Sequence, residues 1–388
     1  MPSCKIGVYR DVIGRRILGN MNPTIEETKL IVPTTNPSPR FPLGPAWWGA
    51  VMGTGIASTL TQLHAGQTTL GADLARFFLV AGWAFAVIFT IGFAIRCLRT
   101  TGAWAASMHG VGASAWGMVS MGILSIGSAT ATVLADWAPQ FTTVSWGVDG
   151  ALWVIGTALG LITTFGFSLA LIRRRNAEPR PAWGLAVVPL MVSATCGAPF
   201  IAKLDSPVLA ATLLAVLIFC FVTSLMLGII IFAAAYCHHA RVDRIPAELS
   251  ASSWIPLGVV GQSTAAAQAI SSQMHRFILP EAMPGIQAVA NVYGIVMLCA
   301  AIPVVIFAVS TTTFGIANKM SFSPGWWALT FPVGTLSLGA LNLGHSLQSN
   351  GYSAVGIGAW ILLLSTWTVC AIASLRHPFL AKSPAPAN

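Results

Sequence analysis

Hydroxyl and amide side chains recur along five segments that otherwise consist mainly of glycine, alanine and aliphatic residues. Between their ends these segments contain no Asp, Glu, Lys or Arg, so a solute could meet only uncharged side chains, backbone N–H groups and helix ends. Such groups bind an anion weakly, which suits a passage that must also release it. The candidate lining residues are Thr54, Ser58, Ser120, Ser193, Gln262, Ser263, Thr330 and Thr335.

Each hydroxyl also has a purely structural alternative, because Ser and Thr inside a helix often donate to a carbonyl of the preceding turn. The lack of carboxylates within these five segments argues against a proton- or sodium-driven pump, and the lack of arginine there argues against a tight carboxylate site. Asp149 heads an aliphatic segment and is expected at the membrane interface.

No pattern for enzymatic chemistry is present. The sequence has no phosphate-binding glycine loop and no GxSxG or HExxH motif. The seven cysteines are scattered without CxxC or Cys/His ligand spacing, so neither disulfides nor a metal site is predicted. The sequence therefore favours a protein that is not an enzyme and needs no cofactor.

The composition is that of a polytopic membrane protein. Hydrophobic residues make up 55% of the chain and charged residues 8%, against about 25% charged in soluble domains. The mean hydropathy is +0.75. The net charge of +9 arises from basic residues in the tails and alternate loops, which indicates membrane topology and not a nucleic-acid partner.

The apolar segments predict an all-α fold of ten transmembrane helices in a five-fold repeat. Segments rich in small residues alternate with aliphatic ones, and each such pair is expected to form a hairpin. Five small-residue helices would then form an inner ring around a central pore, with five aliphatic helices facing lipid. The alternative is a solid bundle that the small residues merely tighten. The expected spans are 46–64, 74–98, 111–135, 148–172, 182–202, 207–236, 255–273, 284–312, 323–345 and 352–375.

Prolines stand near the start of most small-residue segments, and Pro189, Pro256 and Pro332 are expected to bend their helices. Residues 1–40 are predicted to be a partly disordered cytoplasmic tail, 41–376 the transmembrane domain and 377–388 a second cytoplasmic tail. Basic residues concentrate in the loops after the even-numbered spans, which predicts that both termini are cytoplasmic, in the plasma membrane.

Several motifs resemble the tellurite-resistance/dicarboxylate transporter family. They are Phe41-Pro42, the run Val51-Met52-Gly53-Thr54-Gly55, the segment around Pro189, and Trp326-Trp327-Ala328 followed by Phe331-Pro332. That family includes bacterial tellurite-resistance proteins, fungal malate permeases and sulfite efflux pumps, and plant slow anion channels. The resemblance covers about residues 42–375. It implies ten helices in five hairpins with quasi-five-fold symmetry, usually as a homotrimer with one pore per protomer.

The resemblance also implies a role for Phe331, which matches the phenylalanine that plugs the pore in this family. The implied function is transport of a small anionic solute across a lipid bilayer, with a C4-dicarboxylate such as malate or succinate as the default substrate. The alternative is an anion channel, or a sulfite or tellurite-resistance type exporter, with a Phe-gated pore. A structural membrane subunit without transport is a third possibility.

Overall fold

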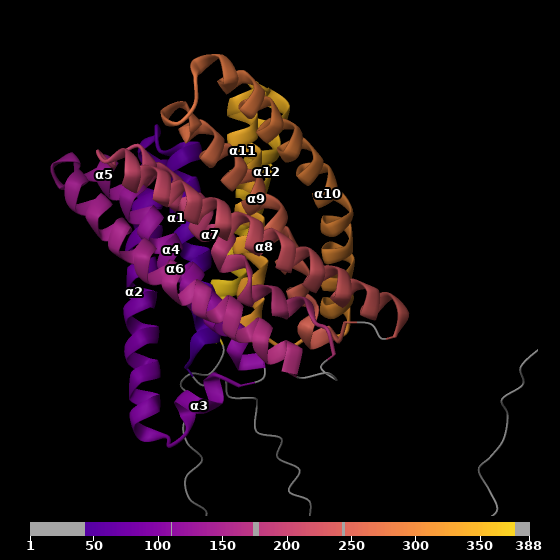
Figure 1. Cartoon of the computed structure of the whole chain (residues 1–388). Coiled ribbons are helices and arrows are strands. Elements are labelled where there is room, and N and C mark those ends of the chain that lie inside the picture. Colours follow the sequence, from indigo (N-terminus) through magenta and orange to yellow (C-terminus); the bar gives the residue numbers. More distant parts are fainter. Residues whose placement is uncertain (1–42, 110, 174–177, 243–244, 377–388) are drawn as a thin grey trace, which may run out of the picture. The chain divides into compact units, whose positions relative to one another are not determined.

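The computed structural model describes residues 43–109, 111–173, 178–242 and 245–376. The predicted tails 1–40 and 377–388 lie outside this part of the chain. Within it, all regular secondary structure is helical (Figure 1). The long α-helices are α1 (Trp48–Ala65), α2 (Thr69–Arg99), α4 (Val111–Ala129), α6 (Thr142–Arg173), α7 (Val188–Ile201), α8 (Pro207–Arg241), α9 (Ile255–Gln273), α10 (Met283–Ala317), α11 (Phe331–Leu347) and α12 (Asn350–Arg376).

Shorter helices join or extend these. The short α-helices are α3 (Ala103–Ser107) and α5 (Ala135–Trp137), and a π-helical turn, η2 (Thr130–Leu134), continues α4. The 3₁₀ helices are η1 (Pro45–Trp47), η3 (Pro139–Phe141), η4 (Pro181–Ala186), η5 (Ala247–Trp254), η6 (Met274–Arg276), η7 (Pro280–Ala282) and η8 (Pro324–Leu329).

Seven helical stretches in the described residues are long and apolar enough to cross a membrane. Helices α1, α9 and α11, which were expected to span, are not among them, so ten crossings stay a prediction. Their Gly, Ser, Thr, Gln and His residues lower the hydropathy, and α11 has only 17 residues. The seven stretches are Thr69–Arg99, Gly112–Trp137, Pro139–Arg173, Pro181–Ile201, Pro207–Arg241, Pro280–Ala317 and Asn350–Arg376.

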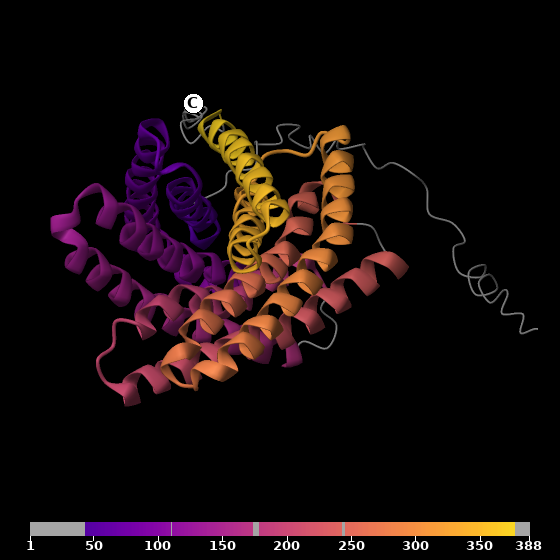
Figure 2. The same cartoon turned by 90° about the horizontal axis from the view of Figure 1, so that it is seen from above.

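Long helices that follow one another pack in pairs, and helices from different pairs also meet. The sequential pairs are α1 with α2, α4 with α6, α7 with α8, α9 with α10 and α11 with α12 (Figure 2). The first members also contact each other in order, α1 with α4, α4 with α7, α7 with α9 and α9 with α11, and α11 contacts α1. The contacts among these five helices, called the ring helices below, therefore close on themselves.

Burial separates the ring helices from their partners. In the apolar windows of Gly112–Trp137 and Pro181–Ile201, 72% and 83% of residues are buried. The corresponding share is 22% to 33% for the stretches that contain α2, α6, α8, α10 and α12. An apolar surface left uncovered on a long helix is suited to lipid contact, so these five partner helices carry the apolar surface that a bilayer could cover.

Helices α9 and α11 approach each other closely at Gly261. A Cβ atom on this residue would overlap the backbone of Thr335 and Leu336. At this contact the Thr335 hydroxyl donates to the carbonyl of Leu257 on α9 over 3.3 Å. Glycine is required here because any side chain would force the two helix backbones apart.

The three prolines that were predicted to bend helices all lie in the first turn of an α-helix. Pro189, Pro256 and Pro332 occupy the first or second position of α7, α9 and α11. Each comes shortly after a 3₁₀ helix, η4, η5 or η8. Proline costs no hydrogen bond in a first turn, since the N–H it lacks has no partner within the helix. Each proline thus marks the change from 3₁₀ to α geometry and does not interrupt an α-helix.

Candidate anion pathway

Phe331 is the first residue of α11 and is buried, with 3% of its surface exposed. It belongs to the main apolar cluster of the protein. The preceding residue, Thr330, donates its hydroxyl to the carbonyl of Trp327 over 2.7 Å. A Cβ atom at Gly53 of α1 would overlap this Thr330 side chain. The junction of η8 and α11 is therefore packed directly against α1. That Phe331, which lies in this junction, gates a passage stays a prediction.

Three of the predicted lining residues hydrogen-bond to an outer partner helix. The Ser58 hydroxyl donates to the carbonyl of Ala75 on α2 over 2.8 Å. Ser120 donates to the carbonyl of Gly156 on α6 over 2.6 Å. Thr54 accepts a 2.8 Å hydrogen bond from the indole of Trp367 on α12. These bonds attach ring helices to the helices behind them.

The remaining hydroxyls that were predicted to line a pore donate to main-chain carbonyls. Ser193 bonds to Pro189 over 3.0 Å and Ser263 to Val260 over 3.2 Å, each within its own helix. Thr335 bonds both within α11 and across to α9. An anion needs donors, and these protons already have acceptors in this conformation. That these hydroxyls line a pathway stays a prediction.

Gln262 on α9 differs from the other predicted lining residues. Its side chain is 2% exposed, and its Oε1 has no hydrogen-bond partner in the described part of the chain. Its backbone carbonyl accepts from the Thr195 hydroxyl on α7 over 3.4 Å, so the residue lies where two ring helices meet. A buried amide oxygen without a partner is unusual. It is an acceptor and does not itself bind an anion, so a role of Gln262 in the pathway stays a prediction.

Two histidines near the C-terminal ends of ring helices bring ionisable groups together. His64 Nε2 lies 3.1 Å from the Ser337 hydroxyl, and its ring stacks on Trp360 with 5.4 Å between centroids. His345 on α11 is close enough to His64 to interact electrostatically. Among the described residues, no three His, Cys, Asp or Glu side chains are grouped as a metal site would require.

Asp149 on α6 was expected at the membrane interface, but its side chain is buried inside the protein. It is 3% exposed, and its Oδ1 has no hydrogen-bond partner among the described residues. The sequence held one signal for this residue, an acid within a long aliphatic segment. Because Asp149 lies near the start of that segment, the sequence did not indicate whether its side chain faces the membrane interface or the protein interior.

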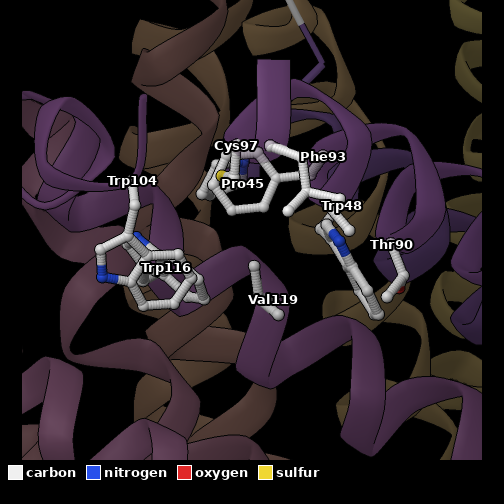
Figure 3. Close-up of a pocket in the computed structure, with 10 residues that line it drawn as sticks. Pro45, Trp48, Thr90, Phe93, Cys97, Trp104, Trp116 and Val119 are labelled. Carbon is white, nitrogen blue, oxygen red and sulfur yellow. The ribbon is translucent and has the colours of Figure 1, made fainter. Parts of the chain in front are cut away.

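An apolar pocket of about 590 Å³ lies among η1, α1, α2, α3 and α4 (Figure 3). Trp104 and Trp116 stand on one side of it and Trp48 on the other. The Thr90 hydroxyl in its wall donates to the carbonyl of Ala86 over 2.6 Å and so is not available to a ligand. The lining includes no charged or amide side chain, and therefore this pocket is unsuited to an anion.

Comparison with known proteins identifies the family. The chain is 23% identical over 339 residues to the sulfite efflux pump SSU1 of Arthroderma benhamiae and likewise 23% identical to that of Trichophyton rubrum. It is 21% identical to the sulfite efflux pump SSU1 of Arthroderma otae. Each alignment covers 84% of this chain and 88% of the relative.

The family model for SLAC1, the voltage-dependent anion channel, matches residues 42–375. This range includes the ring helices and their partners up to Leu375, the penultimate residue of α12, and agrees with the extent of the resemblance found in the sequence. The resemblance to the family of slow anion channels and sulfite efflux pumps is thus confirmed. The chain belongs to the SLAC1 family of anion-transporting membrane proteins.

Proposed function

We propose that this protein conducts a small monovalent inorganic anion of the sulfite class through a passage formed by the ring helices. The observation that carries the proposal is the absence of Asp, Glu, Lys and Arg from all five of these helices. The cost of moving an ion out of water rises steeply with its charge, and a lining without cations cannot compensate a dianion. The sulfite efflux pumps among the relatives support the same class of substrate.

A C4-dicarboxylate, the default substrate from the sequence, is the second candidate. Its support is the resemblance to a family that includes malate permeases. Two carboxylates held in a pore are ordinarily met by Arg or Lys side chains, and the ring helices provide none. The absence of Arg and Lys from the ring helices therefore favours the smaller, singly charged anion.

The architecture that we propose has ten membrane crossings, arranged as five hairpins with quasi-five-fold symmetry around a central pore. The closed set of contacts among the ring helices supports it. Helices α1 and α9 contain 18 and 19 residues, and at 1.5 Å per residue each is about as long as the ~30 Å hydrocarbon core. Because neighbouring helices cover them, they need less hydropathy than a lipid-exposed span. Phe331 gates the pore, both termini are cytoplasmic in the plasma membrane, and the assembly is a homotrimer with one pore per protomer.

The test is flux through purified protein in liposomes under an imposed voltage. Sulfite, chloride and malate are compared at a mildly acidic pH, where hydrogensulfite is the main sulfite species, with protein-free liposomes as the control. Sulfite or chloride flux well above malate flux supports the proposal. Saturable malate flux with little chloride current identifies a dicarboxylate transporter instead. No flux of any anion rejects both and leaves the structural-subunit alternative.

A further inference from the structure

Asp149 lies on the inward face of α6, the outer helix paired with α4. The buried residues Ser145, Gly156 and Gly160 share this face. One turn before Asp149, the Ser145 hydroxyl donates to the carbonyl of Thr142 and so does not bond to the carboxyl group. The Asp149 carboxyl therefore points into the protein and not toward lipid.

The carboxyl group occupies a space that α4 leaves free. A Cβ atom on Gly127 would lie 2.6 Å from Asp149 Oδ1 and 3.2 Å from the Cβ of Leu152. The acid thus fits against the α4 backbone only because residue 127 has no side chain. Three residues later α4 changes to the π-helical turn Thr130–Leu134, a local irregularity that often accompanies functional positions.

No cation compensates this carboxyl group in the described structure. The ion pairs there are Arg76–Asp73 and Arg180–Glu178, both at the surface. Among the main neighbours of α6, neither α4 nor η2, η3 or η4 carries an acidic or basic side chain. Asp136 on α5 is exposed and bonds to Gln62 over 3.0 Å.

Two ionisable groups that face α6 lie on or just after α7. The Cys196 thiol lies close enough to the carboxyl to interact with it electrostatically, and it also lies near the Ser128 side chain on α4. Lys203, which follows α7, places its ammonium over the ring of Trp146, 3.9 Å from the centroid. Trp146 precedes Asp149 by about one helical turn, and Lys203 forms no ion pair with the acid. Ser128 and Cys196 are both partly exposed, on two adjacent ring helices.

An ionised carboxylate that is buried without a cation or sufficient donors is strongly disfavoured, whereas its protonated form is not. We propose that Asp149 is a proton-binding site beside the anion pathway and that anions pass readily only while it is protonated. This inference rests on the proposed function. When the O–H proton leaves to water, the carboxylate adds a negative charge beside Cys196 and Ser128 and repels the permeating anion. Transport is thereby linked to pH through a residue on an outer helix, apart from His64 and His345 at the C-terminal ends of α1 and α11.

The linkage is tested with chloride and methanesulfonate, whose own charge does not change with pH. Flux through wild-type protein is expected to fall about tenfold as pH rises through the titration of Asp149, which corresponds to ~1.4 kcal/mol of added barrier. Asp149→Asn, which mimics the protonated form, is expected to keep high flux at every pH. Asp136→Asn is the matched control at an exposed acid and should follow the wild-type profile. Equal pH profiles in wild type and Asp149→Asn overturn the inference, whereas no wild-type flux at any pH overturns the proposed function.

A second measurement detects the protonation state of Asp149 independently of any transport assay. Infrared spectroscopy of the wild-type protein at neutral pH is expected to show the carbonyl band of a buried protonated carboxyl group, which disappears in Asp149→Asn. Absence of this band in the wild type overturns the inference. Gly127→Ala provides an independent variant, because its methyl group displaces the carboxyl and should move the pH midpoint of flux. An unmoved midpoint in a folded Gly127→Ala protein also counts against the site.

Discussion

The indole Nε1 of Trp367 on α12 donates a hydrogen bond to the hydroxyl of Thr54 on α1, with 2.8 Å between the two atoms. Thr54 is completely buried, and the Trp367 ring packs edge-on against Phe78 and Trp327. The pair joins the first long helix of the described chain to the last. The Thr54 hydroxyl, which was predicted to face a solute, instead links ring helix α1 to outer helix α12 through this hydrogen bond.

We predict that Thr54→Val lowers the free energy of unfolding by about 1–3 kcal/mol, because the indole N–H is left buried without an acceptor. Thermal unfolding in detergent measures the change. Thr54→Ser keeps the hydroxyl and is the control, for which most of the stability should remain. If the valine and serine variants unfold at the same temperature, the hydrogen bond does not stabilise the fold.

Phe331→Ala is expected to raise chloride flux in liposomes about tenfold or more, equivalent to removing ~1.4 kcal/mol of barrier. The reason is that the proposed gate loses the ring that fills the passage. Phe165→Ala is the matched control, since Phe165 on α6 is 49% exposed on the outer surface. Unchanged flux in a folded Phe331→Ala protein would show that this ring does not occlude the pathway.

Gly261→Ala is expected to destabilise the protein by about 1–3 kcal/mol, because the added methyl group overlaps the α11 backbone at Thr335 and Leu336. The control is Gly285→Ala on α10, where an added Cβ atom has no neighbour within 4 Å. Both variants are compared by thermal unfolding at equal detergent concentration. Equal melting temperatures would mean that α9 and α11 can move apart enough to accommodate the methyl group without loss of stability.

Gln262→Glu is expected to reduce chloride flux about tenfold or more, since a negative charge between α7 and α9 would repel the permeating anion. Gln262→Met has a similar size and no charge, and should retain most of the flux. Gln140→Glu introduces the same charge at an exposed position of η3 and serves as the second control. Similar flux in Gln262→Glu and Gln140→Glu would place Gln262 away from the pathway.

Local patterns in the sequence were sufficient to locate many helices. The expected segment 255–273 coincides with α9, because Pro256 marks its first turn and small residues continue to its polar end. The motif from Trp326 to Pro332 was specific enough to indicate the family. Hydropathy alone did not establish which helices cross the membrane, since α1, α9 and α11 are covered by other helices and their composition reflects packing.

The class of protein, the alternation of small-residue and aliphatic helices and the family follow from the sequence by itself, because each depends on composition or on residues close together in the chain. Only the tertiary structure decided that Ser58 and Ser120 point to outer helices and that Asp149 points inward. The physical reason is that the rotation of a helix about its axis is set by contacts with neighbours far away in sequence. The space at Gly127 that admits Asp149 likewise exists only once α4 and α6 are packed together.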